Sequence, residues 1–296
     1  MSMTSVRNIV RLLIKTQIYL SRRFDSRLSE KFRTDGMRDF MDSFVPRYLE
    51  AHLRVYDVGG GKNPAIDLPT KAGLGITLVG LDIDEDELSQ AAHGVYDETI
   101  CADITEYEGR QDADLVVCKA VLEHVVSVER ALASISSILK IGGRAIIFVP
   151  SRNAVYSRLN LILPQDLKVK LLSLFNPDGV GAEGFPAYYD RCTPKDFSTI
   201  ASCYGMEVIE SRLYFSSGYF SYFFPAHLLW RVWLLCFYWL RREQAAESFS
   251  MAFEKRRRQG EACASHSASA SEGTRAVRSG GLQPFIGLSA RHWCSR

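Results

Sequence analysis

The sequence contains no CxxC pair, and its seven cysteines are scattered and odd in number. A disulfide framework or a structural zinc site needs cysteines at short, paired spacings, so neither is expected. A strong excess of one charge is also missing, because 36 basic and 34 acidic residues leave a net charge of +2. The overall charge therefore gives no indication of a nucleic-acid partner. Scattered cysteines are typical of a reducing compartment, and we expect a cytoplasmic protein.

Long uninterrupted apolar runs are missing as well. Arg11 and Lys15 interrupt the first apolar stretch, residues 9–20, which argues against both a secretory signal and a membrane span. Residues 1–24 contain no acidic residue, and their basic side chains interleave with apolar ones. This pattern predicts a basic amphipathic helix that either lies on an anionic membrane surface or packs on the domain edge with its basic side solvated. An organellar transit peptide has a similar composition.

Short apolar strands alternate with helical segments over residues 53–150. The strand-like segments are LRVYDVG, TLVGLDI, ETIC, ADLVVC and RAIIFVP. The clearest helix between them is expected over residues 128–140, with Ser127 as its N-cap. Such alternation implies right-handed crossovers, and it predicts an α/β fold with a doubly wound, mostly parallel sheet and helices on both faces.

The rest of the chain carries weaker or different patterns. Thr193 and Pro194 begin a predicted helix, and residues 206–215 read as a sixth strand. A hairpin into YFSYFF would supply a seventh strand, unless that aromatic run is helical. We divide the chain into N-terminal helices (1–50), the α/β domain (51–225) with a lid insertion (151–191), aromatic and amphipathic helices (226–258) and a disordered tail (259–296).

Glycines and carboxylates stand at the carboxyl ends of the first three predicted strands. The run DVGGG covers residues 57–61, Asp82 ends the second strand, and Asp103 follows the third. Parallel sheets bind ligands at these strand ends, and glycine lets a ligand approach the main chain closely. A carboxylate such as Asp82 can accept hydrogen bonds from two ribose hydroxyls, and Asp103 can accept one from an adenine amine. The three positions predict a site for an adenosine-containing cofactor.

The same segments resemble successive motifs of the class I S-adenosylmethionine (SAM)-dependent methyltransferases, in particular the ubiquinone/menaquinone-type group. The motifs are DVGGGKNP, GLDIDEDEL, CADI, ADLVVCKAVLEHV and SILKIGGRAIIFVP. The resemblance implies a seven-stranded Rossmann-like sheet, SAM as the cofactor, and methyl transfer to an oxygen of a small-molecule, lipid or sugar acceptor. The positions expected at the cofactor, with the neighbouring Gly60 and Lys119 included, are Asp57, Gly59, Gly60, Gly61, Asp82, Ile83, Asp103, Ile104, Cys118 and Lys119.

Three residues depart from related patterns. Asn63 stands where the family often has a third glycine, and Asn tolerates left-handed backbone angles. Ala120 replaces an acid of some metal-dependent relatives, so we expect no metal site. Pro64 stands where the nicotinamide fingerprint needs its last glycine, which disfavours the alternative of an NAD-type Rossmann oxidoreductase. A SAM-binding scaffold without activity remains a second alternative.

His124 is the candidate catalytic base, because it follows the fourth strand at the edge of the predicted cleft. Its alternative role is to anchor the start of the LEHV helix or to fill the edge of the core. Lys119 is similarly placed, but the solvated rim is the interpretation that we favour for it. Tyr188 and Tyr189 lie in the segment expected to cover the cleft, and we take them as candidate substrate contacts.

Aromatic residues are concentrated in residues 214–240. The segment fits a core with a homodimer interface, a peripheral membrane contact shared with the N-terminal helix, or the lining of an acceptor pocket. Nucleic acid is not expected as the acceptor. The fourth strand ends in CKAVLEHV, which lacks the Asn/Asp-Pro-Pro-aromatic segment that grips a flipped base.

Overall fold

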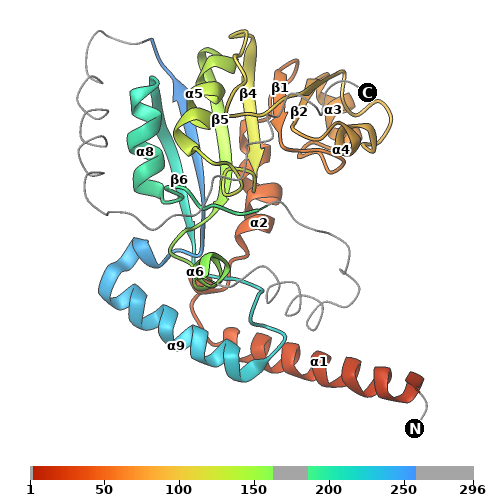
Figure 1. Cartoon of the computed structure of the whole chain (residues 1–296), viewed down its shortest axis with the longest axis vertical. Helices are drawn as coiled ribbons and strands as arrows, with labels where there is room; N and C mark the ends of the chain where they lie inside the picture. The colour runs from red at the N-terminus through yellow and green to blue at the C-terminus, as the bar shows by residue number, and fades with distance from the viewer. Residues whose placement is uncertain (1–2, 163–185, 258–296) are drawn as a thin grey trace, which may run out of the picture. The chain divides into compact units, whose positions relative to one another are not determined.

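A seven-stranded sheet forms the centre of the computed structural model, which describes residues 3–162 and 186–257 (Figure 1). The strand order is β3-β2-β1-β4-β5-β7-β6. β7 runs antiparallel to both of its neighbours, and all other pairs are parallel. The strands are β1 (Arg54–Val58), β2 (Thr77–Asp82), β3 (Glu98–Cys101), β4 (Ala113–Lys119), β5 (Leu139–Pro150), β6 (Met206–Tyr214) and β7 (Ser248–Lys255).

Helices cover both faces of this sheet, as the alternating sequence pattern predicts. α5 and α8 pack on one face, and the segment from α2 to residue 48 packs on the other, together with α3. The Rossmann-like α/β class is therefore confirmed. The helices are α1 (Met3–Asp25), α2 (Gly36–Asp39), α3 (Leu68–Leu74), α4 (Glu85–Ser89), α5 (Val128–Ile138), α6 (Val155–Ile162), α8 (Pro194–Cys203) and α9 (Phe224–Arg241).

β4 shows how one strand serves both hydrophobic cores. Leu115 and Val117 pack on the same side as Phe40, whereas Val116 and Cys118 face the side covered by α5. Successive side chains of a strand point to opposite faces, so a strand buried on both faces is apolar at nearly every position. This burial holds the carboxyl end of β4 rigidly beside that of β1.

The predicted helix caps form where the sequence places them. Ser127 Oγ accepts a hydrogen bond from the amide of Arg130 at 3.3 Å, and Thr193 Oγ1 accepts one from the amide of Asp196 at 3.2 Å. α5 ends at Ile138, two residues before the expected end, because Leu139 is already extended and begins β5. The local signals therefore fix where these helices start better than where they end.

The seventh strand is not formed by YFSYFF. Residues 215–223 form turns, α9 follows, and residues 248–255 then insert between β5 and β6 as β7. Residues 226–258 are therefore not helical throughout, and the sheet extends beyond residue 225. The physical reason is backbone pairing. β7 pairs with two strands at once, and it follows β6 from Met206 to Tyr214 with one register shift between Val208 and Glu210.

Two predicted parts of the chain lie wholly or largely outside the described residues. They are the tail (259–296) and most of the lid insertion (151–191), of which α6 and residues 186–191 are described. The predicted basic N-terminal helix is present as α1, whose C-terminal half packs along α9 (Figure 1). Among the described helices, none combines the length and apolar character needed to cross a membrane.

Candidate functional site

A cavity of about 370 Å³ opens at the carboxyl ends of β1 to β4. Its volume is within the range of small-ligand sites, and its position is that of ligand sites in open α/β sheets. Seven of the predicted site residues line it: Gly59, Asp82, Ile83, Asp103, Ile104, His124 and Tyr188. The structure thus brings together residues from the ends of β1 to β4 and from the segment around Tyr188.

The glycine loop after β1 brings its backbone close to neighbouring side chains. Gly59 has φ +71°, and a Cβ at this position would lie 2.2 Å from Cγ2 of Val121. Gly61 also has positive φ, at +47°, and a Cβ on Gly60 would lie 2.4 Å from Oδ2 of Asp57. Side chains at these positions would collide or force strained angles, so glycine is required here. Asn63 adopts no left-handed angle; instead its amide donates to the carbonyl of Gly60 at 2.9 Å.

Asp57 lies beneath this loop and is fully buried. Its Oδ2 accepts hydrogen bonds from the amide of Ala65 at 2.7 Å and from the hydroxyl of Tyr96 at 3.4 Å. Burial raises the pKa of Asp57 to about 6, against the opposing effects of the Ala65 bond and the charge of Lys119. Its buried Oδ1 has no hydrogen-bond partner among the described residues. The carboxylate therefore holds the loop with one oxygen and leaves the other oxygen for a donor.

Asp82 and Asp103 present carboxylates from the ends of β2 and β3. Oδ1 of Asp82 accepts the amide of Asp84 at 3.1 Å, and burial raises the pKa of Asp82. Oδ1 of Asp103 accepts the amide of Thr105 at 2.7 Å. In each case a local turn fixes the side chain while the carboxylate remains at the cavity wall. Ile83 beside them is 57% exposed, so an apolar side chain here is available to pack on a ligand.

His124 lines the cavity from the loop that follows β4. Its Nδ1 lies 3.1 Å from the carbonyl oxygen of Pro186, and its Nε2 lies 3.8 Å from Oε1 of Glu123. A carbonyl only accepts, so Nδ1 is the donor in this contact, and Nε2 is the nitrogen with the free lone pair in the corresponding neutral tautomer. This tautomer is the one a general base needs.

The two predicted substrate tyrosines differ in position. Tyr188 lines the cavity and is half-exposed, whereas Tyr189 is buried. The amides of both donate to the carbonyl of Glu123, at 2.8 and 3.0 Å. The segment around Pro186 is thereby attached directly to the loop that carries His124.

Five predicted cofactor residues do not line the cavity: Asp57 and Gly61, described above, and Gly60, Cys118 and Lys119. Cys118 is fully buried, and burial raises the pKa of its thiol. Lys119 donates from Nζ to the carbonyl of Asn63 at 3.2 Å, which ties β4 to the glycine loop. Gly60 packs against Asp57. Direct contact of these residues with a cofactor stays a prediction.

The sequence did not predict that Ala120 lines the cavity or that the side chain of Glu123 is buried. Ala120 lines the cavity in the left-handed region, with φ +55°, a conformation that costs about 1–3 kcal/mol outside glycine. Glu123 is only 4% exposed, and burial raises its pKa to about 8. The only sequence signal was the LEHV segment itself, which does not show which side chain turns inward. Within residues 3–162 and 186–257, no cluster of three or more metal-ligating side chains is present.

Comparisons with known proteins agree with this geometry. Residues 56–147 match the family model described as a methyltransferase domain. No curated protein matches the chain. A chain of the complex between the Haloferax volcanii Trm112 methyltransferase activator and the putative methyltransferase is 16% identical, with a TM-score of 0.50 over 75% of this chain and 93% of that one.

Two further solved structures are similar at a lower score. A SAM-dependent methyltransferase from Mesorhizobium loti is 15% identical over 76% of this chain and 100% of its own, with a TM-score of 0.49. Phosphoethanolamine N-methyltransferase 2 from Haemonchus contortus, in complex with SAM, is 15% identical over 81% of this chain and 57% of its own, with a TM-score of 0.48. The match over residues 56–147 indicates a methyltransferase domain in this part of the chain, and the strand order is that of a doubly wound α/β sheet.

Proposed function

We propose that this chain transfers the methyl group of SAM to an oxygen of a small-molecule, lipid or sugar acceptor by in-line displacement. The observation that carries the proposal is the convergence of Gly59, Asp82 and Asp103 on one cavity beside His124. SAM supplies an electrophilic methyl group on a positively charged sulfur. The protein's contribution is to bind and orient the two reactants, which can supply up to about 7–11 kcal/mol of the barrier reduction.

The residues present fit this cofactor. Asp82 offers acceptors for ribose hydroxyls, Asp103 for an exocyclic amine, and Ile83 an apolar surface for a purine ring. The unpartnered Oδ1 of Asp57 suits the ammonium group of an amino acid. The Gly59–Gly61 loop leaves space where a side chain would collide.

His124 is proposed as the base that receives the acceptor's proton. Its Nε2 would accept the proton of the acceptor hydroxyl, and bound SAM would supply the methyl group to that oxygen. The contact of Nδ1 with the carbonyl of Pro186 holds the ring in the tautomer that this step needs. A base of this kind contributes roughly 10²–10⁴-fold to the rate.

A thermal-shift comparison tests the cofactor. We expect SAM and S-adenosylhomocysteine to raise the melting temperature, because ligands that bind only the folded state stabilise it. Stabilisation by NAD alone would instead favour the oxidoreductase alternative. A screen with isotope-labelled SAM on quinones, lipids and sugars then addresses the acceptor. Binding of SAM with no labelled product from any of them would favour the scaffold alternative.

Replacing Asp82 with Ala is expected to weaken SAM binding by about 10- to 150-fold. This range follows from the roughly 1.5–3 kcal/mol that hydrogen bonds to a charged group contribute. Isothermal titration measures it directly. Asp86→Ala is the matched control, because Asp86 is an exposed carboxylate nearby that does not line the cavity. Equal affinity of Asp82→Ala and wild type would remove Asp82 from the cofactor site.

Replacing His124 with Ala is expected to lower kcat about 10²–10⁴-fold while leaving SAM affinity nearly unchanged. The separate readouts matter, because a purely structural histidine would lower stability and both parameters together. The matched control is His93→Ala, an exposed histidine that does not line the cavity. Full turnover by His124→Ala on the identified acceptor would exclude His124 as the base.

A further inference from the structure

α9 presents an exposed apolar stripe. Leu229, Val232, Trp233, Trp239 and Leu240 are 72%, 53%, 37%, 74% and 66% exposed. Residues three, four and seven positions apart share one face of a helix, so these side chains form a continuous surface along the helix. A contiguous exposed patch of tryptophan and leucine is typical of a surface that binds another protein or a membrane.

The inward face of the same helix carries its charge. His227, Trp230, Arg231 and Leu234 are all buried, and Arg231 is 0% exposed. Arg231 is also the only charged residue between Phe224 and Leu240. An ordinary surface helix turns its apolar side to the core and its charges to water. In α9 the one arginine is buried among apolar side chains, and apolar side chains also face outward, which is not expected of a helix that faces only water.

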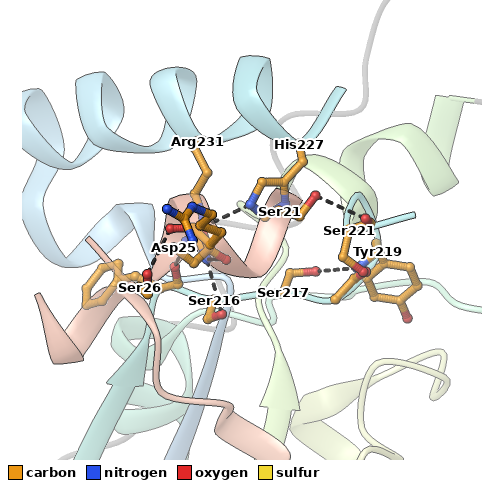
Figure 2. A network of polar contacts seen from close by, with 12 residues as sticks. Ser21, Asp25, Ser26, Ser216, Ser217, Tyr219, Ser221, His227 and Arg231 are labelled. Atoms are coloured by element: carbon orange, nitrogen blue, oxygen red, sulfur yellow. Dashed lines mark hydrogen bonds and ion pairs between the residues drawn. The ribbon is translucent and has the colours of Figure 1, made fainter. Parts of the chain in front are cut away.

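Asp25 at the end of α1 holds this buried charge (Figure 2). Its two carboxylate oxygens accept hydrogen bonds from Nε and Nη2 of Arg231, both at 2.8 Å, and Oδ1 also lies 2.9 Å from Nε2 of His227. Arg231 Nη1 donates to the carbonyl of Phe215 at 2.9 Å. The bidentate geometry fixes the rotation of α9, so its apolar stripe is held facing outward.

α1 extends this surface and adds positive charge. Leu12, Leu13 and Tyr19 are 66%, 57% and 59% exposed, and the basic residues Arg11 and Lys15 are exposed among them. Ser21 on its other side is buried and donates to the carbonyl of Ser221. The side of α1 that packs against the protein and the side that remains open are thus distinct.

The charge of this face is of one sign. Residues 1–24 and 211–242 contain no acidic residue, and the one acid of α1, Asp25, is already paired with Arg231. A symmetric contact with a second copy would bring like charges together on an isologous interface. An anionic bilayer offers the opposite charge, together with an apolar interior for leucine and an interface that tryptophan and tyrosine favour.

We propose that α1 and α9 form a docking face that lies in the plane of an anionic lipid bilayer. The apolar stripe of α9 enters the interface, while Arg11, Lys15 and the exposed Arg241 and Arg242 contact lipid head groups. The proposal concerns where the protein binds and does not depend on the methyl acceptor.

Flotation of the full chain with lipid vesicles, without SAM, tests this proposal separately from the proposed function. We expect binding to phosphatidylcholine vesicles that contain phosphatidylglycerol and much weaker binding to pure phosphatidylcholine. Leu229→Gln with Leu240→Gln should weaken binding by at least about a hundredfold. Arg11→Gln with Lys15→Gln should weaken it by about tenfold or more.

Matched controls are Ile141→Gln and Lys195→Gln, which change an exposed apolar side chain and an exposed basic one outside this face. Both should bind as wild type does, and thermal unfolding should confirm that all variants are folded. Absence of binding to the anionic vesicles, or undiminished binding by the Leu229/Leu240 variant, would overturn the proposal. So would a dimer in sedimentation experiments that the same variant disperses, because a second copy would then occupy the face.

Discussion

Replacing Asp25 with Asn is expected to lower the free energy of unfolding at pH 7 by about 3–5 kcal/mol. The substitution keeps the shape of the side chain and removes its charge. The guanidinium of Arg231, which is 0% exposed, would then remain buried without the carboxylate that pairs with it. The cost of such an uncompensated charge greatly exceeds the worth of an exposed ion pair. Urea unfolding of the purified chain, followed by circular dichroism, measures the change.

Asp42→Asn is the matched control for this prediction. Asp42 pairs with Arg38 one helical turn away, but both side chains are more than two-thirds exposed, at 71% and 82%. Its replacement should cost less than about 0.5 kcal/mol. Adding Arg231→Met to Asp25→Asn should recover most of the loss, because an apolar side chain of similar length needs no counter-ion. A loss below about 1 kcal/mol for Asp25→Asn, the value of an exposed ion pair, would contradict the role of Asp25 as the partner of the buried Arg231.

The pH dependence of this contact has a definite sign. Against the effect of burial, the hydrogen bonds and charges of His227 and Arg231 hold the pKa of Asp25 below its usual 3.8. A group whose pKa is lower in the folded protein stabilises it above the unfolded pKa. That stability is lost as the pH falls through the folded value. The contact is therefore at full strength at neutral pH, and Asp25→Asn should remove its acid-dependent part.

Replacing Glu123 with Gln is expected to stabilise the protein at pH 9 by on the order of 2–4 kcal/mol, since a tenfold change in proton affinity corresponds to about 1.36 kcal/mol. Burial raises the pKa of Glu123 from 4.5 to about 8. The folded protein thus keeps a proton that the unfolded chain loses near pH 4.5, and this group makes stability fall as the pH rises from about 4.5 to 8. Gln resembles the protonated acid and has no such dependence.

Urea unfolding at pH 5 and pH 9 tests this sign. The gain from Glu123→Gln should be small at pH 5, where the native side chain is already neutral in the folded protein, and full at pH 9. Glu106→Gln is the control, because its side chain is 68% exposed and should change stability by no more than about 0.5 kcal/mol at either pH. An equal effect of Glu123→Gln at both pH values would mean that Glu123 is ionised when folded, contrary to the prediction.

The cavity-lining residues at the strand ends were predictable because their signals are local. A strand that is apolar at nearly every position ends at a glycine or a carboxylate, and parallel strands bring those ends to one edge. Asp82, Asp103 and Gly59 could be placed on this basis. Whether a residue lines the cavity or supports it depends on which way one side chain points. Cys118 and Asp57 both lie on strands and turn into the protein, and the sequence pattern does not show that.

The structure of residues 224–255 was harder to predict, because the residues that decide it are far apart in the sequence. The run SFSMAFEK alternates small polar and apolar residues, which is a strand signal, yet its neighbours in the sheet include β5, about 100 residues earlier along the chain. α9 is apolar on nearly every side, so periodicity could not show which face is buried. The orientation of α9 is decided by Arg231 and Asp25, which are 206 residues apart.

β6 and β7 are adjacent antiparallel strands, so the chain between them, which contains α9, is the loop of a β-hairpin. Tyr214 and Ser248 stand opposite each other in register, so α9 is an insertion between two adjacent strands and not a link between layers. A short turn would close the same sheet. The cavity and the exposed stripe of α9 are therefore built on different elements, the cavity at the ends of β1 to β4 and the stripe within the β6–β7 connection.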